Sequence, residues 1–580
     1  MSSAWQRSSE IGKRFWLAAV LATFLLSPFP GRSATPVPRN AAPGVGYVGS
    51  KMCAGCHAEI YRSYLRTAMG RSVTKASSET LSAPVAVQSQ ALDRLFTVSR
   101  DASGLYQTES QEAGGRKVFE NKQRIEYVIG SGENGKSYVV RRGDYLFQAP
   151  LSYYTKIQKW DLSPGFESSD QGFNRPIYDA CITCHAGRPQ PIPRRDGLYR
   201  NPAFLELAIG CENCHGPGQL HVAERSRGHA ASPDTSIVNP ARLPARLAED
   251  ICMKCHQGGD TRALLPGKDY ADFRPGAPLI QTVAIVSLPL RSDQTDLLEH
   301  HVSMRLSKCY RASAGKLSCL TCHNPHEEPT ESEAPAYFRK RCLTCHSESS
   351  CRVSLETRLH QEPADNCIGC HMPKRDVRKI SHAALTNHRI PARPDQPIDL
   401  NLPGASSAGL PGLLLLDSSQ QPGVLPDVTK LAVYGDLLNR QPSLQPKYLD
   451  LLNHLGQTIP DDPLVQAALG RKALLEMSAQ AVGYLSRAVA QDTPGADTFL
   501  DLVKALTKQG RSADAASALA RGINLFPYSQ ILRKHQILSY IQAKDYVRAE
   551  ASMDAYVNDF PEDSFMRKLL ADVRANSSGR

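Results

Sequence analysis

The sequence predicts a mixed fold: a mostly irregular and α-helical region rich in cysteine, a small antiparallel β insertion within it, and an all-α repeat region towards the C-terminus. Three observations carry this prediction. Fourteen of the sixteen cysteines fall in one repeated motif, Cys-x-x-Cys-His, between residues 53 and 371. Apolar and polar residues alternate between the first two motifs, as in half-buried strands. A 34-residue period runs from residue 481 to residue 553, which is typical of helical repeats.

The N-terminus has the pattern of an export signal. Arg7, Lys13 and Arg14 precede an apolar run over residues 15–26. About a dozen apolar residues fall short of the roughly 20 that a membrane span needs, so residues 1–34 predict a cleaved secretory signal peptide. We expect the mature chain in the periplasm, without a transmembrane span. An uncleaved signal that anchors the protein is the alternative.

Length and composition indicate a folded chain with more than one domain. The chain has 580 residues, of which 41% are hydrophobic and 22% charged, which fits two or three folded domains. The formal net charge is +11, and the signal segment supplies +3 of it. The chain without that segment keeps +8.

The cysteine motifs have the spacing that attaches haem. Two thiols three positions apart reach the two vinyl groups of one porphyrin, and the next residue, His, is aimed at the iron. Zinc sites and redox dithiols also use CxxC pairs, but they do not need a His after every second Cys. We therefore predict seven c-type haems with iron, bound at Cys53/Cys56/His57, Cys181/Cys184/His185, Cys211/Cys214/His215, Cys252/Cys255/His256, Cys319/Cys322/His323, Cys342/Cys345/His346 and Cys367/Cys370/His371.

The haems also change the charge of the protein. Each has two propionates against one excess positive charge on its ferric iron, so seven haems add about seven negative charges in net. The loaded protein is then near neutral, and we infer no nucleic-acid partner.

A low-spin haem needs a second axial ligand, and further histidines of the same region are the candidates. His221 and His326 follow the third and fifth motifs closely, and the short turn between directs each of them at a neighbouring haem rather than its own. The other candidates are His388, His382 and one of the pair His300 and His301, with His229 and His360 left open.

The first motif has no other histidine for over 120 residues, but Met69 follows it. A thioether ligand would raise the potential of that haem. Packing of Met69 in the core is the alternative.

Two cysteines, Cys309 and Cys351, lie outside the motifs. Thiols outside the cytoplasm tend to oxidise, so a disulfide between them would clamp the fifth and sixth motifs. Two unpaired thiols are the alternative.

The spacing of motifs indicates one haem-packed domain over residues 45–394. From each His to the next Cys the chain runs 26 and 37 residues among the second to fourth motifs, and 19 and 21 among the fifth to seventh. Such spacers are too short for independent domains, so haems must fill the core. The β insertion is predicted over residues 85–160, with turns at 101–104 and 130–135. It isolates the first motif from the others.

The C-terminal region is predicted to be a solenoid. Residues 395–427 are rich in Pro, Gly, Ser and Leu and read as a linker. In residues 428–575, Ala481, Ala515 and Ala549 recur every 34 positions, and Pro494, Pro527 and Pro561 follow them. This period is that of tetratricopeptide repeats, which offer a concave surface to a protein or peptide.

Three strings, CENCHGPGQLH, SKCYRASAGKLSCLTCHNPH and NCIGCHMPK, resemble those of bacterial multihaem c-type cytochromes related to the tetrahaem cytochrome c of ammonia oxidisers, in versions that end in tetratricopeptide repeats. The resemblance covers residues 47–392 and the repeats. The same superfamily includes pentahaem nitrite reductases and octahaem hydroxylamine oxidoreductases. This chain departs from them, because none of its motifs has Lys in place of His and no tyrosine crosslink motif is evident.

These observations predict an electron-transfer protein that relays electrons between redox partners, with the repeats as docking module. The alternative is an oxidoreductase acting on a small inorganic substrate, such as a nitrogen oxide, at a haem with an open site. A scaffold for a respiratory complex is a third function. The relay is favoured over an enzyme because eight spare histidines and Met69 suffice for seven distal positions.

Overall fold

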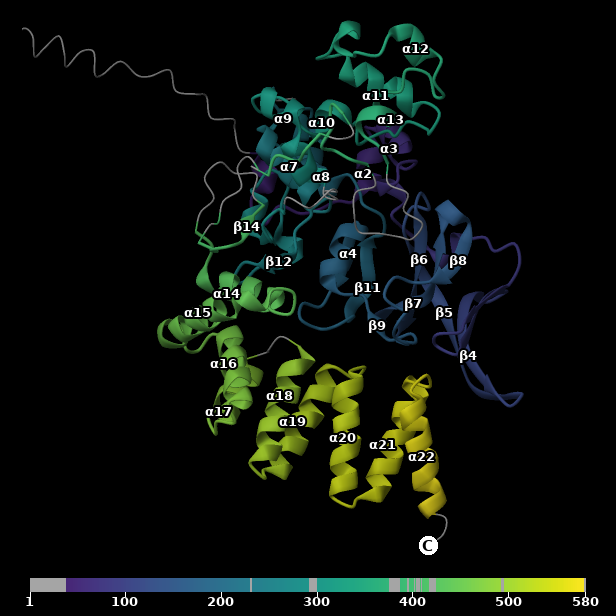
Figure 1. The fold of residues 1–580 in the computed structure, drawn as a ribbon, viewed down its shortest axis with the longest axis vertical. Coiled ribbons are helices and arrows are strands. Elements are labelled where there is room, and N and C mark those ends of the chain that lie inside the picture. The colour runs from purple at the N-terminus through teal and green to yellow at the C-terminus, as the bar shows by residue number, and fades with distance from the viewer. Residues whose placement is uncertain are drawn as a thin grey trace, which may run out of the picture.

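The structure is a computed structural model. It describes residues 38–229, 232–291, 300–374, 386–393, 396–400, 402, 407, 409–416, 424–491 and 495–577. The predicted signal peptide and the candidate ligand His382 lie outside the described residues. Figure 1 shows most of the cysteine-bearing helices at one end of the molecule, the sheet in the middle and the C-terminal helices at the other end. The mixed fold is thus confirmed, whereas packing of the core by haem stays a prediction.

The β insertion is a nine-stranded sheet in which every strand pairing is antiparallel. Its main path runs from β2 to β8 in chain order, with β1 paired to β5 and β9 paired to β7. The sheet extends beyond the predicted range 85–160 at both ends. The strands are β1 (Val73–Lys75), β2 (Val85–Ser89), β3 (Arg94–Asp101), β4 (Gly104–Ala113), β5 (Arg116–Ile129), β6 (Gly135–Arg142), β7 (Tyr145–Tyr154), β8 (Lys159–Leu162) and β9 (Arg175–Pro176).

The sheet curls until it is nearly closed, so that its apolar face forms an interior. Phe96, Val98 and Phe147 are buried there. Gln107 on β4 reaches across to β7, where its side chain donates to the Leu151 carbonyl at 3.0 Å and accepts from the Leu151 N–H at 2.9 Å. Because a buried amide needs partners for both of its polar atoms, this pair of bonds fixes the curl.

The segment predicted as a linker is partly packed. A three-stranded sheet joins β12 (Thr261–Leu264), β13 (Val283–Ser287) and β14 (Leu414–Leu415), and β14 belongs to this segment. Leu410, Leu413 and Leu415 are buried against the first helices of the C-terminal region. Residues 409–416 therefore bind the two regions together. A separate two-stranded sheet pairs β10 (Arg188–Pro191) with β11 (Tyr199–Glu206).

The helices of the cysteine-rich region are short, because most of them are the single turns of the motifs and their flanks. They are α2 (Ser50–Ala54), α3 (Ala58–Tyr64), α4 (Asp179–His185), α5 (Glu212–His215), α6 (Gln219–Ser226), α7 (Ala245–Met253), α8 (His300–Leu306), α9 (Lys308–Ala312), α10 (Cys319–Cys322), α11 (Ala334–Cys342), α12 (Leu355–Leu359) and α13 (Cys367–His371).

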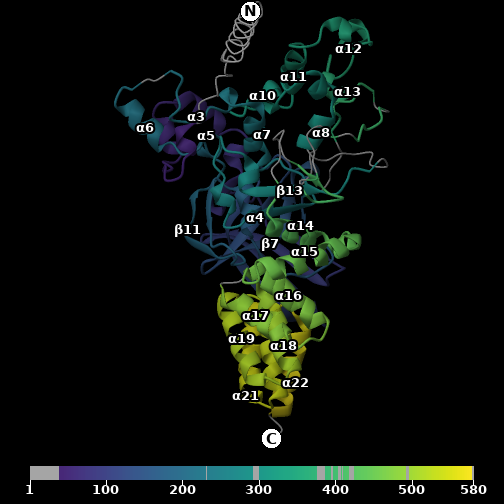
Figure 2. The same ribbon diagram turned by 90° about the vertical axis from the view of Figure 1, so that its left-hand side faces the viewer.

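The C-terminal region is helical throughout most of its described residues, and its helices stack in one column (Figure 2). The predicted period is visible in the packing, since Ala481, Ala515 and Ala549 are 2%, 6% and 0% exposed at successive helix contacts. The helices are α14 (Asp427–Leu437), α15 (Gln445–Thr458), α16 (Pro463–Leu475), α17 (Ala481–Ala490), α18 (Ala496–Lys508), α19 (Ser512–Leu525), α20 (Gln530–Gln542), α21 (Tyr546–Asp559) and α22 (Ser564–Ser577). Among the described residues, no helix has the length and hydropathy of a membrane span.

The end of the helical column rests on the sheet. The guanidinium group of Arg94 donates to the Glu562 carbonyl at 3.0 Å, and Asn174 donates to the Glu562 carboxylate at 2.7 Å. The guanidinium carbon of Arg142 lies 4.4 Å from the ring centre of Tyr528. Burial raises the pKa of Glu562 to about 7. The contact between repeats and sheet is therefore polar, buried and sensitive to protonation.

Candidate functional site

Each Cys-x-x-Cys-His motif forms one tight helical turn. In five motifs the N–H of the His donates to the carbonyl of the first Cys at 2.8–3.0 Å, and in the second and seventh the His lies inside α4 and α13. This turn places the two sulfurs on one side of the backbone with the imidazole after them. We number the motifs site 1 to site 7 in chain order.

The sites lie close together. Thiols of different sites are close neighbours in three pairs, in each of which one thiol shifts the pKa of the other: Cys53 with Cys211, Cys184 with Cys255, and Cys252 with Cys319. In the first pair, the neighbouring thiol raises the pKa of Cys53 and lowers that of Cys211 to about 7. Site 1 therefore adjoins site 3, and site 4 adjoins both site 2 and site 5.

Site 1 is not isolated, which corrects the expectation from the sequence. The carboxylate of Glu212, which is 2% exposed, accepts from the backbone N–H groups of Val48, Gly49 and Gly218 at 2.9, 2.7 and 2.7 Å. The Ser50 hydroxyl accepts from the Cys211 N–H at 2.9 Å. These bonds hold the chain before site 1 on the helix of site 3, although the β insertion separates the two in sequence.

Four histidines of the motifs face a second histidine. The distances between ring centres are 6.4 Å for His57 and His221, 5.9 Å for His215 and His326, 5.4 Å for His256 and His300, and 6.3 Å for His323 and His388. Each pair joins a motif histidine to a residue distant from that motif in the sequence. The pairs are neighbours too, since the rings of His300 and His388 lie 4.6 Å apart.

These separations fit two axial ligands of one iron. Because an imidazole nitrogen binds a transition-metal ion at about 2.0 Å and lies about 1.1 Å from its ring centre, two imidazoles on opposite sides of one ion have ring centres about 6.2 Å apart. Three of the four pairs lie within about 0.3 Å of this value. The pair His256 and His300 is closer and its ring planes are inclined by 79°.

The protonation of these histidines suits metal binding as well. Burial lowers the pKa of His323 to about 4 and that of His300 to about 3, so both are neutral, which is the form that binds iron. The Nδ1 atoms of His215, His371 and His388 lie 2.8–2.9 Å from the backbone carbonyl oxygens of Val238, Pro391 and Thr386. Such bonds leave Nε2 for the metal.

The structure separates the two adjacent candidates His300 and His301. His300 lies opposite His256, whereas the Nε2 atom of His301 lies 3.3 Å from the carboxylate of Glu249, with both side chains buried. Consecutive residues of a helix point about 100° apart, so only one of them faces site 4. The geometry favours His300.

The structure also places His221 rather than Met69 opposite His57. Met69 is half-buried in a short turn at Met69–Arg71. The reason is the docking of residues 46–49 on α5 and α6, where the Gly46 N–H donates to the Gln219 side chain at 2.7 Å. The sequence carries no signal for this contact.

Motif side chains are exposed at sites 6 and 7, as they are at sites 1, 2, 4 and 5. At sites 6 and 7 the exposed residues are Cys345, His346 and Cys370. The backbone turn itself is intact at site 6, since the His346 N–H donates to the Cys342 carbonyl at 3.0 Å. The assignment of these three residues to haem therefore stays a prediction from their motifs.

Other candidates are placed less specifically. The Nδ1 atom of the exposed His360 lies 2.7 Å from the Glu356 carbonyl of its own helix. Cys309 and Cys351 are both free thiols in the structure. Cys309 lies among the cysteines of sites 5 and 6, whereas Cys351 lies near Cys367 of site 7. Their pairing stays a prediction.

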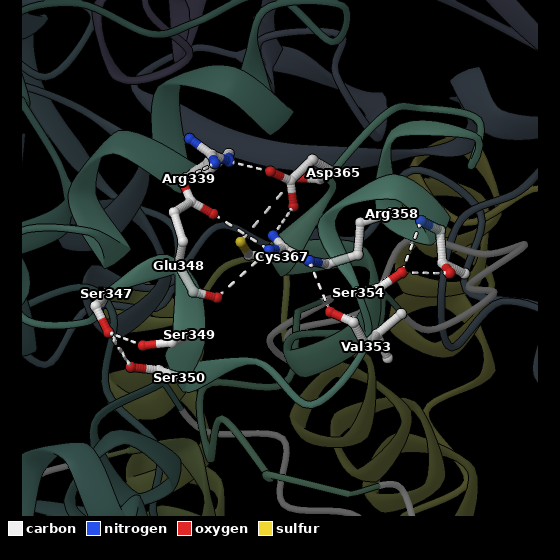
Figure 3. Close-up of polar contacts among 11 residues, drawn as sticks. Arg339, Ser347, Glu348, Ser349, Ser350, Val353, Ser354, Arg358, Asp365 and Cys367 are labelled. Atoms are coloured by element: carbon white, nitrogen blue, oxygen red, sulfur yellow. Dashed lines mark hydrogen bonds and ion pairs between the residues drawn. The ribbon is translucent and has the colours of Figure 1, made fainter.

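An ion-pair network, rather than a large apolar core, holds sites 6 and 7 together (Figure 3). Arg339 on α11 and Arg358 on α12 both bind the carboxylate of Asp365, two residues before Cys367. Arg358 also binds Glu348 at 3.2 Å. Although burial opposes ionisation of Asp365, the hydrogen bonds from the two arginines lower its pKa. The network therefore ties the helix of site 6 to the turn of site 7.

The sequence comparison points to multihaem cytochromes. No protein-family model matches the chain. Over 223 residues it is 24% identical to the multihaem cytochrome MtrA of Shewanella baltica (strain OS185), and the match covers 34% of this chain and 63% of that protein. The match thus spans less than two thirds of the length of this relative.

Solved structures give only distant likenesses. The outer cell wall cytochrome OcwA is 15% identical with a TM-score of 0.35, over 80% of this chain and 99% of that one. The protein MamA is 16% identical with a TM-score of 0.23, over 26% of this chain and 83% of that one. A thermophilic TPR protein of Thermus thermophilus is 16% identical with a TM-score of 0.20, over 26% of this chain and 91% of that one.

Proposed function

We propose that this chain is a multihaem c-type cytochrome that carries seven haems and relays electrons between redox partners. The observation that carries the proposal is the set of four imidazole pairs, three of which have ring centres at the separation expected for two axial ligands of one iron. The similarity to a multihaem cytochrome supports it, as do the motif strings that resemble the tetrahaem cytochromes of ammonia oxidisers. Each haem supplies a one-electron iron couple.

The cysteines and histidines have distinct roles in this proposal. The fourteen motif cysteines bind the haems as thioethers, and the seven motif histidines are the proximal ligands. The distal ligands are His221 at site 1, His326 at site 3, His300 at site 4 and His388 at site 5. His382 remains the candidate for one of the other sites.

The contacts between sites indicate the path. Site 1 adjoins site 3 through Cys53 and Cys211, and site 4 adjoins site 5 through Cys252 and Cys319. Cys214 of site 3 lies near both cysteines of site 4. The cysteines of site 6 lie near those of sites 5 and 7. We therefore infer a chain of sites in the order 1, 3, 4, 5, 6 and 7, with site 2 branching from site 4.

The remaining parts of the proposal concern location and docking. We infer that the chain is exported to the periplasm by residues 1–34 and that the C-terminal repeats dock a protein partner. Helical repeats present a continuous surface for such contacts. The end of this column that contains α22 is occupied by the sheet through Glu562, so the surface left for a partner is on the side of α16 to α19.

Electron paramagnetic resonance of the oxidised protein tests the relay. We expect low-spin signals for the sites with paired histidines. Replacing His388 by alanine removes one distal ligand and should convert one haem to high spin, whereas replacing the exposed His454 on α15 should change nothing. A wild-type protein with a high-spin signal at site 5, or an H388A protein without one, would contradict the assignment.

A further inference from the structure

The segment Asp234–Val238 holds two of the paired histidines in different ways. At one end, the Asp234 carboxylate lies 3.1 Å from Nδ1 of His221, the partner of His57. The Ser236 hydroxyl, which donates to this carboxylate, is hydrogen-bonded to the same Nδ1 atom at 3.2 Å. At the other end, the Val238 carbonyl lies 2.8 Å from Nδ1 of His215. One short segment thus places a carboxylate and its hydroxyl partner beside Nδ1 at site 1, and a backbone carbonyl alone at site 3, although the two sites are neighbours.

Asp234 is held as a carboxylate. Its Oδ1 atom accepts from the N–H and the hydroxyl of Ser236 at 2.8 and 2.5 Å, and its Oδ2 atom binds Arg225. The carboxylate is 18% exposed, so water screens it only in part.

The chemistry of a ligated imidazole makes this difference matter. When Nε2 binds iron, Nδ1–H donates to its partner, and an anionic acceptor draws that proton more strongly than a carbonyl does. The ring then donates more electron density and favours the ferric state. At His215, His371 and His388, by contrast, the Nδ1 acceptor is a backbone carbonyl.

We propose that Asp234 is a positioning residue that lowers the reduction potential of site 1 relative to site 3 by holding a negative charge beside Nδ1 of His221 and on the Ser236 hydroxyl that is hydrogen-bonded to it. This inference rests on the proposed haem ligation. It makes site 1 the donor and site 3 the acceptor of the pair, so that electrons enter the chain of sites at its N-terminal end. The redox partner that reduces the protein then docks near α2 and α6.

The substitution D234N tests the charge while keeping the shape of the side chain. Mutation of the hydrogen-bond partner of a metal-bound histidine typically changes metal affinity or activity by about 10- to 100-fold. We expect the reduction potential of one haem to rise by about 59 mV, which corresponds to a tenfold change in the equilibrium constant of a one-electron reduction. The readout is a redox titration followed by visible absorption on the full-length holoprotein.

The substitution R225Q is the matched variant, because Arg225 compensates the charge of Asp234 at Oδ2, the carboxylate oxygen that also lies next to His221. Loss of this cation should lower the potential of the same haem. If Asp234 only holds the segment together, both variants loosen it and the two potentials move in the same direction or not at all. Opposite shifts at one haem support the proposal, and any other pattern overturns it.

The haem content of the wild-type protein is measured first. A protein with no haem at Cys53 and Cys56 would contradict the proposed function itself. A protein with that haem in place, and with an unchanged potential in D234N, would overturn only the role of Asp234. The two failures are therefore distinguishable.

Discussion

Replacing Glu212 by alanine weakens the contact between sites 1 and 3 without changing residues elsewhere in the fold. The side chain sits one residue after Cys211 and binds the backbone of Val48 and Gly49, which precede site 1. It also binds the N–H of Gly218 in its own loop. The substitution leaves these three N–H groups in a buried place without the carboxylate that accepts from them.

The expected cost follows from the bonds. A hydrogen bond to a charged group is worth about 1.5–3 kcal/mol, so three of them amount to roughly 4.5–9 kcal/mol. Keeping a carboxylate buried costs several kcal/mol, which offsets about half of this sum. We therefore expect a net loss of about 3 kcal/mol in the free energy that holds residues 46–50 on α5.

Hydrogen exchange followed by mass spectrometry measures this loss. A change of about 3 kcal/mol in local opening speeds exchange of the Val48 and Gly49 amides roughly 100-fold. The control is E224Q, because Glu224 forms an ion pair with the exposed Arg39 at 2.7 Å and such pairs contribute about 1 kcal/mol or less. If exchange in E212A is no faster than in E224Q, the proposed docking of site 1 on site 3 is wrong.

Three further predictions concern other parts of the chain. The pKa of Glu562 rises from 4.5 to about 7 on burial. The contribution of this residue to stability is therefore present below pH 4.5 and falls by about 3 kcal/mol as the pH rises through 7. Melting temperatures at pH 5 and pH 8 should differ more in the wild type than in E562Q. H300A should give one high-spin haem, whereas H301A should leave the spin state unchanged. We predict that peptide mapping without reductant finds the peptides of Cys309 and Cys351 joined by a disulfide. Finding both peptides with free thiols would contradict this pairing.

The sequence was sufficient for features that depend on local spacing. The turn of each motif follows from Cys-x-x-Cys-His, and the structure forms it at all seven positions. The hairpin turns at 101–104 and 130–135 lie between strands as expected, because glycine and aspartate specify them locally. The 34-residue period likewise marks residues that contact each other between adjacent helices.

The arrangement of the sites could not be predicted in this way. The bonds of Glu212 join residues about 160 positions apart in sequence, and a carboxylate that accepts from backbone N–H groups leaves no pattern in the partner residues. His300 and His301 are equivalent in sequence, and only the positions of His256 and Glu249 in the fold distinguish them. Asp234 carries no sequence signal either, because its role depends on the place of His221 rather than on a motif.

The length of the β insertion also exceeds the prediction for a physical reason. Strands β1, β8 and β9 are two to four residues long and lack a clear alternation. They are strands because longer neighbours offer them unpaired backbone groups. Residues 409–416 have the glycine and proline of a linker, yet their leucines are buried.

The central claim is that every Cys-x-x-Cys-His motif carries a covalently bound haem. The most direct measurement is the intact mass of the exported protein, taken after denaturation in acid to remove any haem that is not covalently attached. We predict the mass of the polypeptide without its signal peptide plus seven haem groups. The mass of the polypeptide alone, with free or disulfide-bonded cysteines at the motifs, would contradict the account.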